Sequence, residues 1–401
     1  MSDKILNEVN TSPASDMAEP VTAFVAEGVS ETPTPSAEPI AVSVVMPVYN
    51  AADYLRPALD SVLAQTLREI EIICIDDGST DRSLAILKEY QKADNRIRIA
   101  TEANAGPAKA RNNGLRRARG EYLAFLDADD FYEPNLLERL YTLAREKELD
   151  IAVCGYDLFE NRTARFKKSI PSERAEVLAG GRVTGKHECP DVIFQSTEGY
   201  VWNKLFRREF VIEKSLCFLE SAVIFEDVYF TLTALSLAER IARTDEILMH
   251  HRVYSKQGRA RMFRKHYAEV PAVYLAVKEF LVHHGLYLPL SVSFVNSTLG
   301  ICSKVYNLLW IDARISFWTL LHDTYAASFG WAELGESDFF SKEACDFAAN
   351  VSLFTYTQYL KREAHGLKVR FADWTRRKKL EKNRNRAKSF FSSLFGRKKS
   401  E

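Results

Sequence analysis

The stretch 121-EYLAFLDADDFYEP-134 joins two features that determine the architecture of this chain. An apolar run from Tyr122 to Leu126 has the length of a buried strand, and the carboxylates of Asp127, Asp129 and Asp130 follow it directly. Carboxylates at the mouth of a core repel one another and lose hydration, so something must offset that cost. Water around a surface loop would do so, and so would a bound cation with oxygen ligands. The triplet alone leaves both readings open.

Similar apolar runs of strand length recur on both sides of this stretch. They are rich in Val and Ile and hardly alternate with polar residues, which is typical of strands buried on both faces. The expected strands are 41-AVSVVM-46, 70-IEIICI-75, 97-IRI-99, 122-YLAFL-126 and 151-IAVCG-155.

Segments with helical periodicity separate these runs. One has Leu55, Leu59, Val62 and Leu63 on a single face, with Asp53 as its candidate N-cap. A second spans 81–93 with Asp81 as N-cap, and two more begin after Gly106-Pro107 and Glu133-Pro134. Strand and helix alternate, so the sequence predicts an α/β fold with a mostly parallel sheet.

Polar residues gather where the expected strands end. In sheets of this kind, ligands bind beyond the carboxyl ends of the strands, so these residues should line one crevice. So many acids in one crevice imply that some bind a ligand, cap a helix or hold a cation. The residues in question are Pro47, Tyr49, Asn50, Asp76, Asp77, Gly78, Ser79, Asp81, Asp127, Asp129 and Asp130.

Composition excludes several classes of protein. The 401 residues are 46% hydrophobic and 27% charged, with a formal net charge of +0, which gives no overall nucleic-acid signature. Six cysteines lie far apart with no C-x-x-C pair, which argues against a disulfide scaffold or a zinc site and suits a reducing compartment. Residues 1–10 lack the apolar core of a signal peptide, and the uncharged run 285–303 contains Pro289 and Asn296, so we expect a core segment there and not a membrane span.

Phosphate-binding loops are absent or incomplete in the sequence. No G-x-G-x-x-G follows an expected strand, which disfavours a dinucleotide-dependent enzyme. The stretch 180-GGRVTGKH-187 has the spacing of a P-loop, but His187 replaces the Ser or Thr that would reach magnesium. We therefore interpret 180–187 as an ordinary loop.

Four ordered motifs resemble glycosyltransferase family 2. They are 43-SVVMPVYNAADYLRPALDSVLAQT-66, 71-EIICIDDGSTDRS-83, 104-NAGPAKARNNG-114 and 121-EYLAFLDADD-130. The resemblance covers roughly residues 40–260. It implies the GT-A fold, a Rossmann-like and mostly parallel sheet flanked by helices, and transfer of a sugar from a nucleotide-sugar.

The resemblance also implies roles on the donor side. Pro47, Tyr49 and Asn50 would border the nucleotide base, with Tyr49 close to uracil. Asp77, in the D-D-G-S motif with Gly78 and Ser79, would accept a hydrogen bond from the uracil N–H, and Arg111 would lie near the base and the diphosphate. Asp129 would bind a divalent metal, Mg²⁺ or Mn²⁺, and Asp127 would hold the ribose or complete the metal shell. Such a cation would let carboxylates hold an anionic diphosphate.

On the acceptor side, the family pattern W-N-K-L-F followed by E-D matches 199-GYVWNKLFRREFV-211 and 221-SAVIFEDVYF-230. The resemblance implies that Asp227, paired with Glu226, is the general base for the acceptor hydroxyl, although this pair could instead cap a helix over 228–239. Trp202 is a candidate floor for a sugar ring, or a core residue. In 247-ILMHHRVYSKQGRAR-261, His251 is a candidate metal ligand, and Arg252 and Arg259 are candidate partners of the diphosphate. Arg259 stands where the family pattern has Ser.

The expected organisation has four parts. Residues 1–39 read as a disordered tail, 40–260 as the catalytic domain with a nucleotide half (40–155) and an acceptor half (156–260), and 261–375 as a mostly helical extension. The tail 376–401 has eleven Lys or Arg against two acids, with Phe390, Phe391, Leu394 and Phe395 between the basic blocks. This pattern predicts attachment to an anionic membrane surface, with a solvated basic tail as the alternative and no nucleic-acid partner.

The resemblance implies an inverting, metal-dependent hexosyl- or N-acetylhexosaminyltransferase that uses a UDP-sugar. Its acceptor would be a glycan or lipid-linked hydroxyl in cell-surface polysaccharide synthesis, and its location the cytoplasm or the inner face of the membrane. A catalytically silent relative that binds nucleotide or glycan is one alternative, and a nucleotidyltransferase is another.

Overall fold

The computed structural model describes residues 39–169, 172–253 and 262–363. The expected tails 1–39 (apart from its last residue) and 376–401, and the candidate Arg259, lie outside these residues. The six cysteines are all free, as the sequence predicts. Among the described helices, none combines the length and apolarity needed to cross a bilayer.

A nine-stranded sheet forms the base of the molecule, with its strands in the order β3-β2-β1-β4-β8-β6-β9-β5 and with β7 paired to β6. The strands are β1 (Val42–Val48), β2 (Ile70–Asp77), β3 (Ile97–Glu102), β4 (Tyr122–Phe125), β5 (Phe131–Tyr132), β6 (Ile151–Glu160), β7 (Arg165–Lys168), β8 (Lys204–Arg207) and β9 (Ile241–Val253). All five strands expected from the sequence are present.

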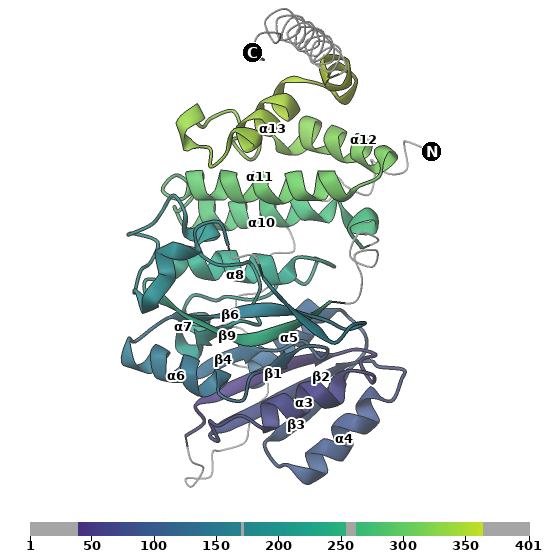
Figure 1. Cartoon of the computed structure of the whole chain (residues 1–401), viewed down its shortest axis with the longest axis vertical. Coiled ribbons are helices and arrows are strands. Elements are labelled where there is room, and N and C mark those ends of the chain that lie inside the picture. Colours follow the sequence, from purple (N-terminus) through teal and green to yellow (C-terminus); the bar gives the residue numbers. More distant parts are fainter. Residues whose placement is uncertain (1–38, 170–171, 254–261, 364–401) are drawn as a thin grey trace, which may run out of the picture.

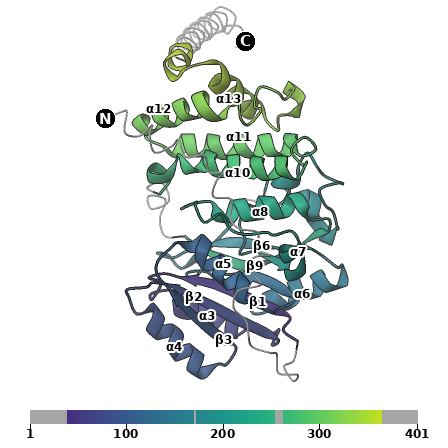
Figure 2. The same cartoon turned by 180° about the vertical axis from the view of Figure 1, so that it is seen from behind.

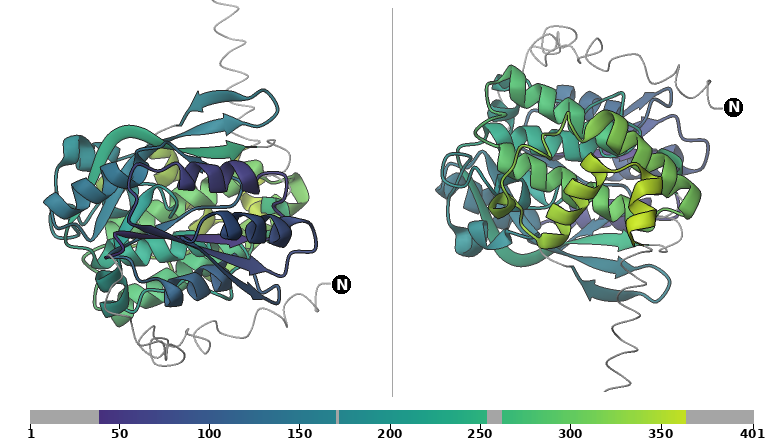
Figure 3. Two further views of the ribbon diagram at one scale, coloured as in Figure 1. Left: turned by 90° about the horizontal axis from the view of Figure 1, so that it is seen from below. Right: turned by 90° about the horizontal axis from the view of Figure 1, so that it is seen from above.

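Parallel pairing holds the first half of this sheet together. β1 pairs in parallel with β2 and β4, and β2 with β3, so their carboxyl ends lie at one edge. β8 then enters antiparallel between β4 and β6, which separates two strands that the alternating pattern would make neighbours. β6 runs through the expected boundary at residue 155 and pairs along its length with β9, and its hairpin with β7 projects from one side of the body (Figure 3).

Helices cover both faces of the sheet. Apolar side chains of α3 (Leu55–Leu63), α4 (Ser83–Ala93) and α6 (Leu136–Glu146) pack in one core with one face of the sheet. α5 (Pro107–Arg117), α7 (Arg208–Glu213) and α8 (Glu226–Leu237) pack in a second core on the other face. The prediction that Asp53 caps α3 is wrong. Tyr54 directly precedes the helix, and its side chain makes no capping hydrogen bond. Asp81 is also not the N-cap, because Arg82 directly precedes α4, but its carboxylate accepts the Ser83 amide at 2.8 Å at the start of this helix.

The C-terminal third is helical, as the sequence predicts. α10 (Glu269–His283) and α11 (Ser291–Leu308) stack above α8, and α12 (Ile311–Leu320) and α13 (Lys342–Leu353) form a further layer (Figures 1 and 2). The uncharged run 285–303 contributes most of α11, whose inner residues belong to the second core. Between β7 and β8 the chain forms short 3-10 helices at Ala175–Gly181 (η2) and Ile193–Gln195 (η3), and 182–187 is loop, as expected.

Two helical glycines differ in their surroundings and test this packing. A Cβ added at Gly114 in α5 would lie 2.3 Å from Cγ1 of Val45 in β1, whereas one added at Gly300 in α11 would meet nothing within 4 Å. Gly114→Ala should therefore force α5 off the sheet and cost about 1–3 kcal/mol of unfolding free energy. Gly300→Ala should be neutral or stabilise by up to about 1 kcal/mol. Urea unfolding of both variants measures this, and equal midpoints would contradict the packing of α5.

Candidate active site

The expected cluster forms at the carboxyl edge of β1, β2 and β4. Val48 at the end of β1 is in register with Asp76 on β2, and β4 ends just before Asp127 on the other side of β1. This edge therefore brings the loop after β1, the D-D-G-S turn and the D-x-D motif (Asp127, Ala128 and Asp129) side by side, as the sequence predicts.

The loop after β1 is locked to the turn after β2. Asn50 adopts a left-handed backbone (φ 47°), and its side-chain carbonyl accepts the amide of Thr80 at 2.8 Å. Its own amide donates to Oγ of Ser79 at 3.1 Å. Asn50 and Ser79 thus fix the loop after β1, while the side chain of Tyr49 in this loop remains 52% exposed.

Two adjacent acids end β2 and differ in their partners. Both carboxylate oxygens of Asp77 accept backbone amides, from Ala105 at 2.8 Å and Gly106 at 2.9 Å, so Asp77 fixes the turn that leads into α5. Asp76 is buried, and its Oδ1 has no hydrogen-bond partner among the described residues. A buried acceptor without a donor is costly, which makes Asp76 a further candidate to bind a ligand N–H or O–H. Gly78 follows with φ +69°, and an added Cβ would lie 2.8 Å from the amide nitrogen of Asn104, so the turn requires glycine here.

Arg111 connects the D-x-D motif to the E-D pair. Its guanidinium donates to Oδ1 of Asp127 and to Oε1 of Glu226, both at 2.6 Å. Arg111 and Glu226 are buried and Asp127 is half-buried. Because a buried charge is tolerated only when it is paired, this bridge gives both carboxylates a cationic partner. It also joins residues 115 positions apart in sequence, from α5 and from the first turn of α8.

Asp227 is the carboxylate of the pair that Arg111 does not bind. It lies half-buried in the first turn of α8. Phe225, the residue directly before this helix, has a left-handed backbone (φ 67°). A non-glycine residue held in this conformation is strained, and such strain recurs at functional sites. Burial and the neighbouring Glu226 raise the pKa of Asp227 to about 7, although Arg111 opposes the rise. A carboxylate with such a pKa can accept a proton near neutral pH.

Asp129 and the adjacent Asp130 contact residues of β9. Asp130 is fully buried and accepts the Arg252 amide at 2.7 Å, and its other oxygen is 3.0 Å from Nδ1 of His251. Burial alone would lower the pKa of His251, but Asp130 raises it above its ordinary value. The side chain of Arg252 donates to the Asp129 carbonyl at 2.7 Å and to Asn161 at 2.8 Å, among the rings of Tyr54, Phe131 and Phe159. These contacts assign Arg252 a structural part beside the D-x-D loop, in addition to any contact with a diphosphate.

Trp202 is not an open floor for a sugar. It is 3% exposed, and its ring is stacked between Tyr200 (4.7 Å between centroids) and His251 (5.3 Å). Both faces of the indole are therefore covered. The structure places Trp202 in the core, and the exposed member of this stack is Tyr200.

The described residues do not form a ready metal site, although the predicted ligands are of suitable kinds. In the part of the chain that the structure describes, no group of three or more His, Cys, Asp or Glu is arranged to hold a metal ion. The kinds of ligand are nevertheless suitable: Asp127 and Asp129 are half-buried carboxylates at one loop, and His251 uses Nδ1 toward Asp130. A carboxylate that orients a histidine in this way is the usual support of a metal-binding imidazole.

Several residues that shape this site have no role that the sequence predicts. Asp130 is the partner of His251, and Tyr200 and Lys204, inside the motif 199–211, hold the loop before β8. His250 is buried between Asp157 (2.6 Å) and Glu133 (2.8 Å), which fixes β9 against β5 and β6. Contacts between residues so far apart in the sequence leave no local sequence pattern that would predict them. The one local hint is the unusual run of two histidines and an arginine at 250–252.

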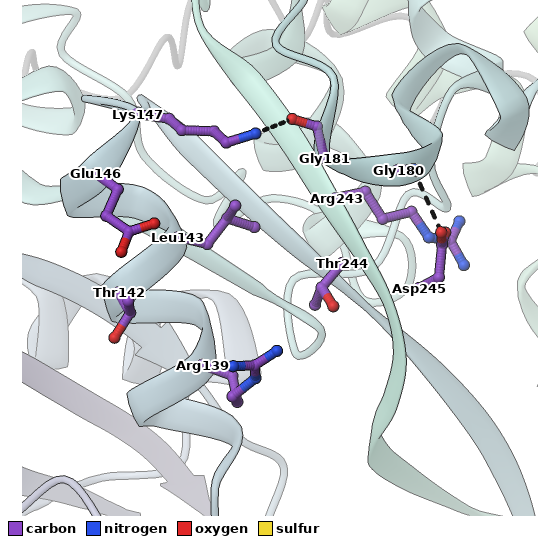
Figure 4. Close-up of a pocket in the computed structure, with 10 residues that line it drawn as sticks. All are labelled: Arg139, Thr142, Leu143, Glu146, Lys147, Gly180, Gly181, Arg243, Thr244 and Asp245. Carbon is purple, nitrogen blue, oxygen red and sulfur yellow. Dashed lines mark hydrogen bonds between the residues drawn. The ribbon is translucent and has the colours of Figure 1, made fainter.

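Two hollows lie away from the strand ends. One of about 330 Å³ is bounded by α6, η2 and β9, where Lys147 bonds the Gly181 carbonyl and Asp245 accepts the Gly180 amide at 3.3 Å (Figure 4). The other, of about 440 Å³, lies between Arg174 and Phe340 on one side and α11 on the other, and Gly300 lines it. Neither hollow contains a residue of the strand-end cluster.

The raised pKa of Asp227 predicts a change in stability. An acid whose pKa is higher in the folded than in the unfolded state destabilises the fold as pH rises from the unfolded to the folded pKa. Asp227→Asn removes that cost, so its melting temperature should exceed that of the wild type at pH 8 by about 2–4 °C per kcal/mol relieved. The difference should shrink at pH 5.5, where Asp227 is largely protonated. Asp53→Asn, at an exposed aspartate, is the control, and a less stable Asp227→Asn at pH 8 would contradict this account.

Comparison with known proteins agrees with this geometry. The sequence profile of Glycosyl transferase family 2 matches residues 43–212. The uncharacterised glycosyltransferase EpsJ of Bacillus subtilis (strain 168) is 37% identical over 215 residues, which are 53% of this chain and 60% of EpsJ. The uncharacterised glycosyltransferase YibD of Escherichia coli (strain K12) is 32% identical over 242 residues, 57% of this chain and 68% of YibD. The match to EpsJ thus spans less than two thirds of that protein.

Among solved structures, TarS 1-349 of S. aureus in complex with UDP-GlcNAc superposes with a TM-score of 0.63. The superposition covers 81% of this chain and 92% of the TarS chain at 19% sequence identity, so this likeness concerns the fold. The mixed sheet with its helical C-terminal region is the GT-A architecture that the sequence predicts. The chain belongs to glycosyltransferase family 2 and is a glycosyltransferase.

Proposed function

We propose that this enzyme transfers a sugar from a UDP-sugar to a hydroxyl group of a glycan or lipid-linked acceptor, with inversion at the anomeric carbon. One observation carries the proposal. Asp227 is a half-buried carboxylate, and burial raises its pKa to about 7. It lies beside Glu226, which Arg111 connects to Asp127 of the D-x-D motif. A proton acceptor and a donor-side acidic loop are thereby held in one site.

Asp227 would take the proton of the acceptor hydroxyl as its oxygen attacks the anomeric carbon and the bond to the diphosphate breaks. A positioned base supplies about 10²–10⁴-fold, or roughly 3–5 kcal/mol of the barrier. A single displacement of this kind inverts the configuration. Glu226, which holds the Arg111 guanidinium, would add negative charge beside Asp227 and so keep Asp227 basic enough for the task.

On the donor side, Tyr49 would lie against the uracil ring, and Asp76 or Asp77 would accept its N–H. The unpartnered Oδ1 of Asp76 favours Asp76, while the two amide bonds of Asp77 favour a supporting part for that residue. UDP-GlcNAc is the first donor to test, because the fold neighbour TarS was crystallised with it.

We further propose dependence on Mg²⁺ or Mn²⁺. Asp127, Asp129 and Nε2 of His251 would hold the ion, which when bound would neutralise charge on the leaving diphosphate. The carboxylate chemistry of this loop and the Asp130–His251 contact support the assignment. An anionic membrane surface reached through residues 376–401 stays a prediction, which cosedimentation with anionic liposomes at low salt would test.

The direct test is release of nucleotide from UDP-, GDP- and CDP-sugars with a panel of simple sugar acceptors, in Mn²⁺ or in EDTA. Turnover should require a UDP-sugar and the metal. Asp129→Asn should abolish it, and this residue is preferred to Asp127, whose change would also break the contact with Arg111. Asp227→Asn should lose about 10²-fold or more in kcat with little change in UDP affinity.

Each outcome separates one part of the proposal from the others. Near-normal turnover of Asp129→Asn in EDTA would contradict the metal role. A parallel fall of UDP affinity and rate in Asp227→Asn would make that residue a donor-side or structural group. Binding of UDP without turnover of any donor would favour the silent relative.

A further inference from the structure

The loop before β8 carries an aromatic stack that runs from the surface to the D-x-D region. Tyr200, Trp202 and His251 lie nearly parallel, with interplanar angles of 14° and 7°, and Tyr156 meets the first two edge-on. Trp202 is buried, whereas Tyr200 is 39% exposed. A stack of this kind fixes the orientation of its outermost ring.

A buried lysine holds this loop rigid. Nζ of Lys204 donates to the carbonyls of Glu198 (2.8 Å) and Tyr200 (2.6 Å) and to Oδ1 of Asn203 (2.8 Å). Lys204 is 1% exposed, and burial lowers its pKa to about 8. The side chain of Asn203 in turn donates to the Cys154 carbonyl on β6 at 3.0 Å. Three acceptors around one ammonium group thus clamp the backbone on both sides of Tyr200.

The same loop lies against the helix that bears the base. A Cβ added at Gly199 would be 3.1 Å from Cγ2 of Val228, the residue after Asp227. At its other end the stack reaches His251 and so Asp130. Gly199, the residue before Tyr200, therefore lies against the first turn of α8.

We propose that Tyr200 is the platform on which a pyranose ring of the acceptor stacks, so that one of its hydroxyl groups faces Asp227. The face of an aromatic ring is electron-rich and apolar and suits the C–H face of a sugar. A ring already held by Trp202 and Lys204 loses little freedom on binding, which favours a productive geometry. This inference rests on the proposed transfer reaction and names the acceptor class as a pyranoside.

The test compares wild type, Tyr200→Phe, Tyr200→Ala and the control Trp310→Ala, which changes an aromatic side chain 67% exposed at the start of α12. The acceptors are methyl pyranosides of glucose, galactose, N-acetylglucosamine and rhamnose, with UDP-GlcNAc and Mn²⁺. Tyr200→Ala should raise the acceptor KM by about three- to tenfold, the range for loss of one ring contact, and not the donor KM. Tyr200→Phe keeps the ring face and should resemble the wild type, as should Trp310→Ala.

Saturation-transfer NMR with the same methyl pyranosides gives a readout that needs no turnover. Wild type and Tyr200→Phe should saturate the C–H protons of one sugar face, and Tyr200→Ala should lose this signal. An unchanged acceptor KM and an unchanged signal in Tyr200→Ala would overturn the platform, as would absence of any signal from the wild type. An equal rise of the donor KM would make Tyr200 a donor-side or structural residue. If the wild type gave this signal but showed no turnover with any of these acceptors, the result would count against the proposed transfer reaction and not against the platform.

Discussion

The contact of Arg111 with Asp127 and Glu226 is the constraint on which the rest of the site depends. It brings together the end of a sheet strand and the first turn of a helix from the second half of the domain. Without the guanidinium, Glu226 would be a buried charge with no counterion, and Asp227 would stand beside it. Arg111 therefore pairs with two of three neighbouring carboxylates, Asp127 and Glu226, and does not bind the third, Asp227.

The sheet supplies the geometry for this arrangement. Parallel pairing of β1, β2 and β4 collects the nucleotide-side loops at one edge, and β9 delivers His251 and Arg252 to the same D-x-D loop. The antiparallel β8 then places the loop of Tyr200 and Trp202 beside α8. The strand-end acids, Asp227 and the aromatic stack thus come from separate segments whose positions are fixed by the strand order.

Local patterns in the sequence predicted the strands and the first helices, because buried strands and amphipathic helices carry their own periodicity. The strand-end cluster was also predictable, since the rule concerning carboxyl ends needs only the order of strand and helix. Contacts between distant residues were not: nothing near Arg111 announces Glu226, and nothing near Trp202 announces that Tyr200 and His251 cover its two faces. The expected cap at Asp53 failed because the chain begins α3 one residue later than that cap requires, after Tyr54. The family resemblance gave roles for Asp77, Asp127 and Asp227, and the structure adds which of them already have partners.

The most direct test of this account is the unfolding free energy of Arg111→Met compared with that of the double variant Arg111→Met/Glu226→Gln, measured by denaturant titration. Removing one partner of a buried ion pair costs about 3–5 kcal/mol, because the other charge is left uncompensated. Arg111→Met should therefore be strongly destabilised. Glu226→Gln in that background should restore a substantial part of the loss, since Asp127 is half-buried and can be hydrated. If the double variant is no more stable than Arg111→Met alone, Arg111 does not balance Glu226, and the account of this site is wrong.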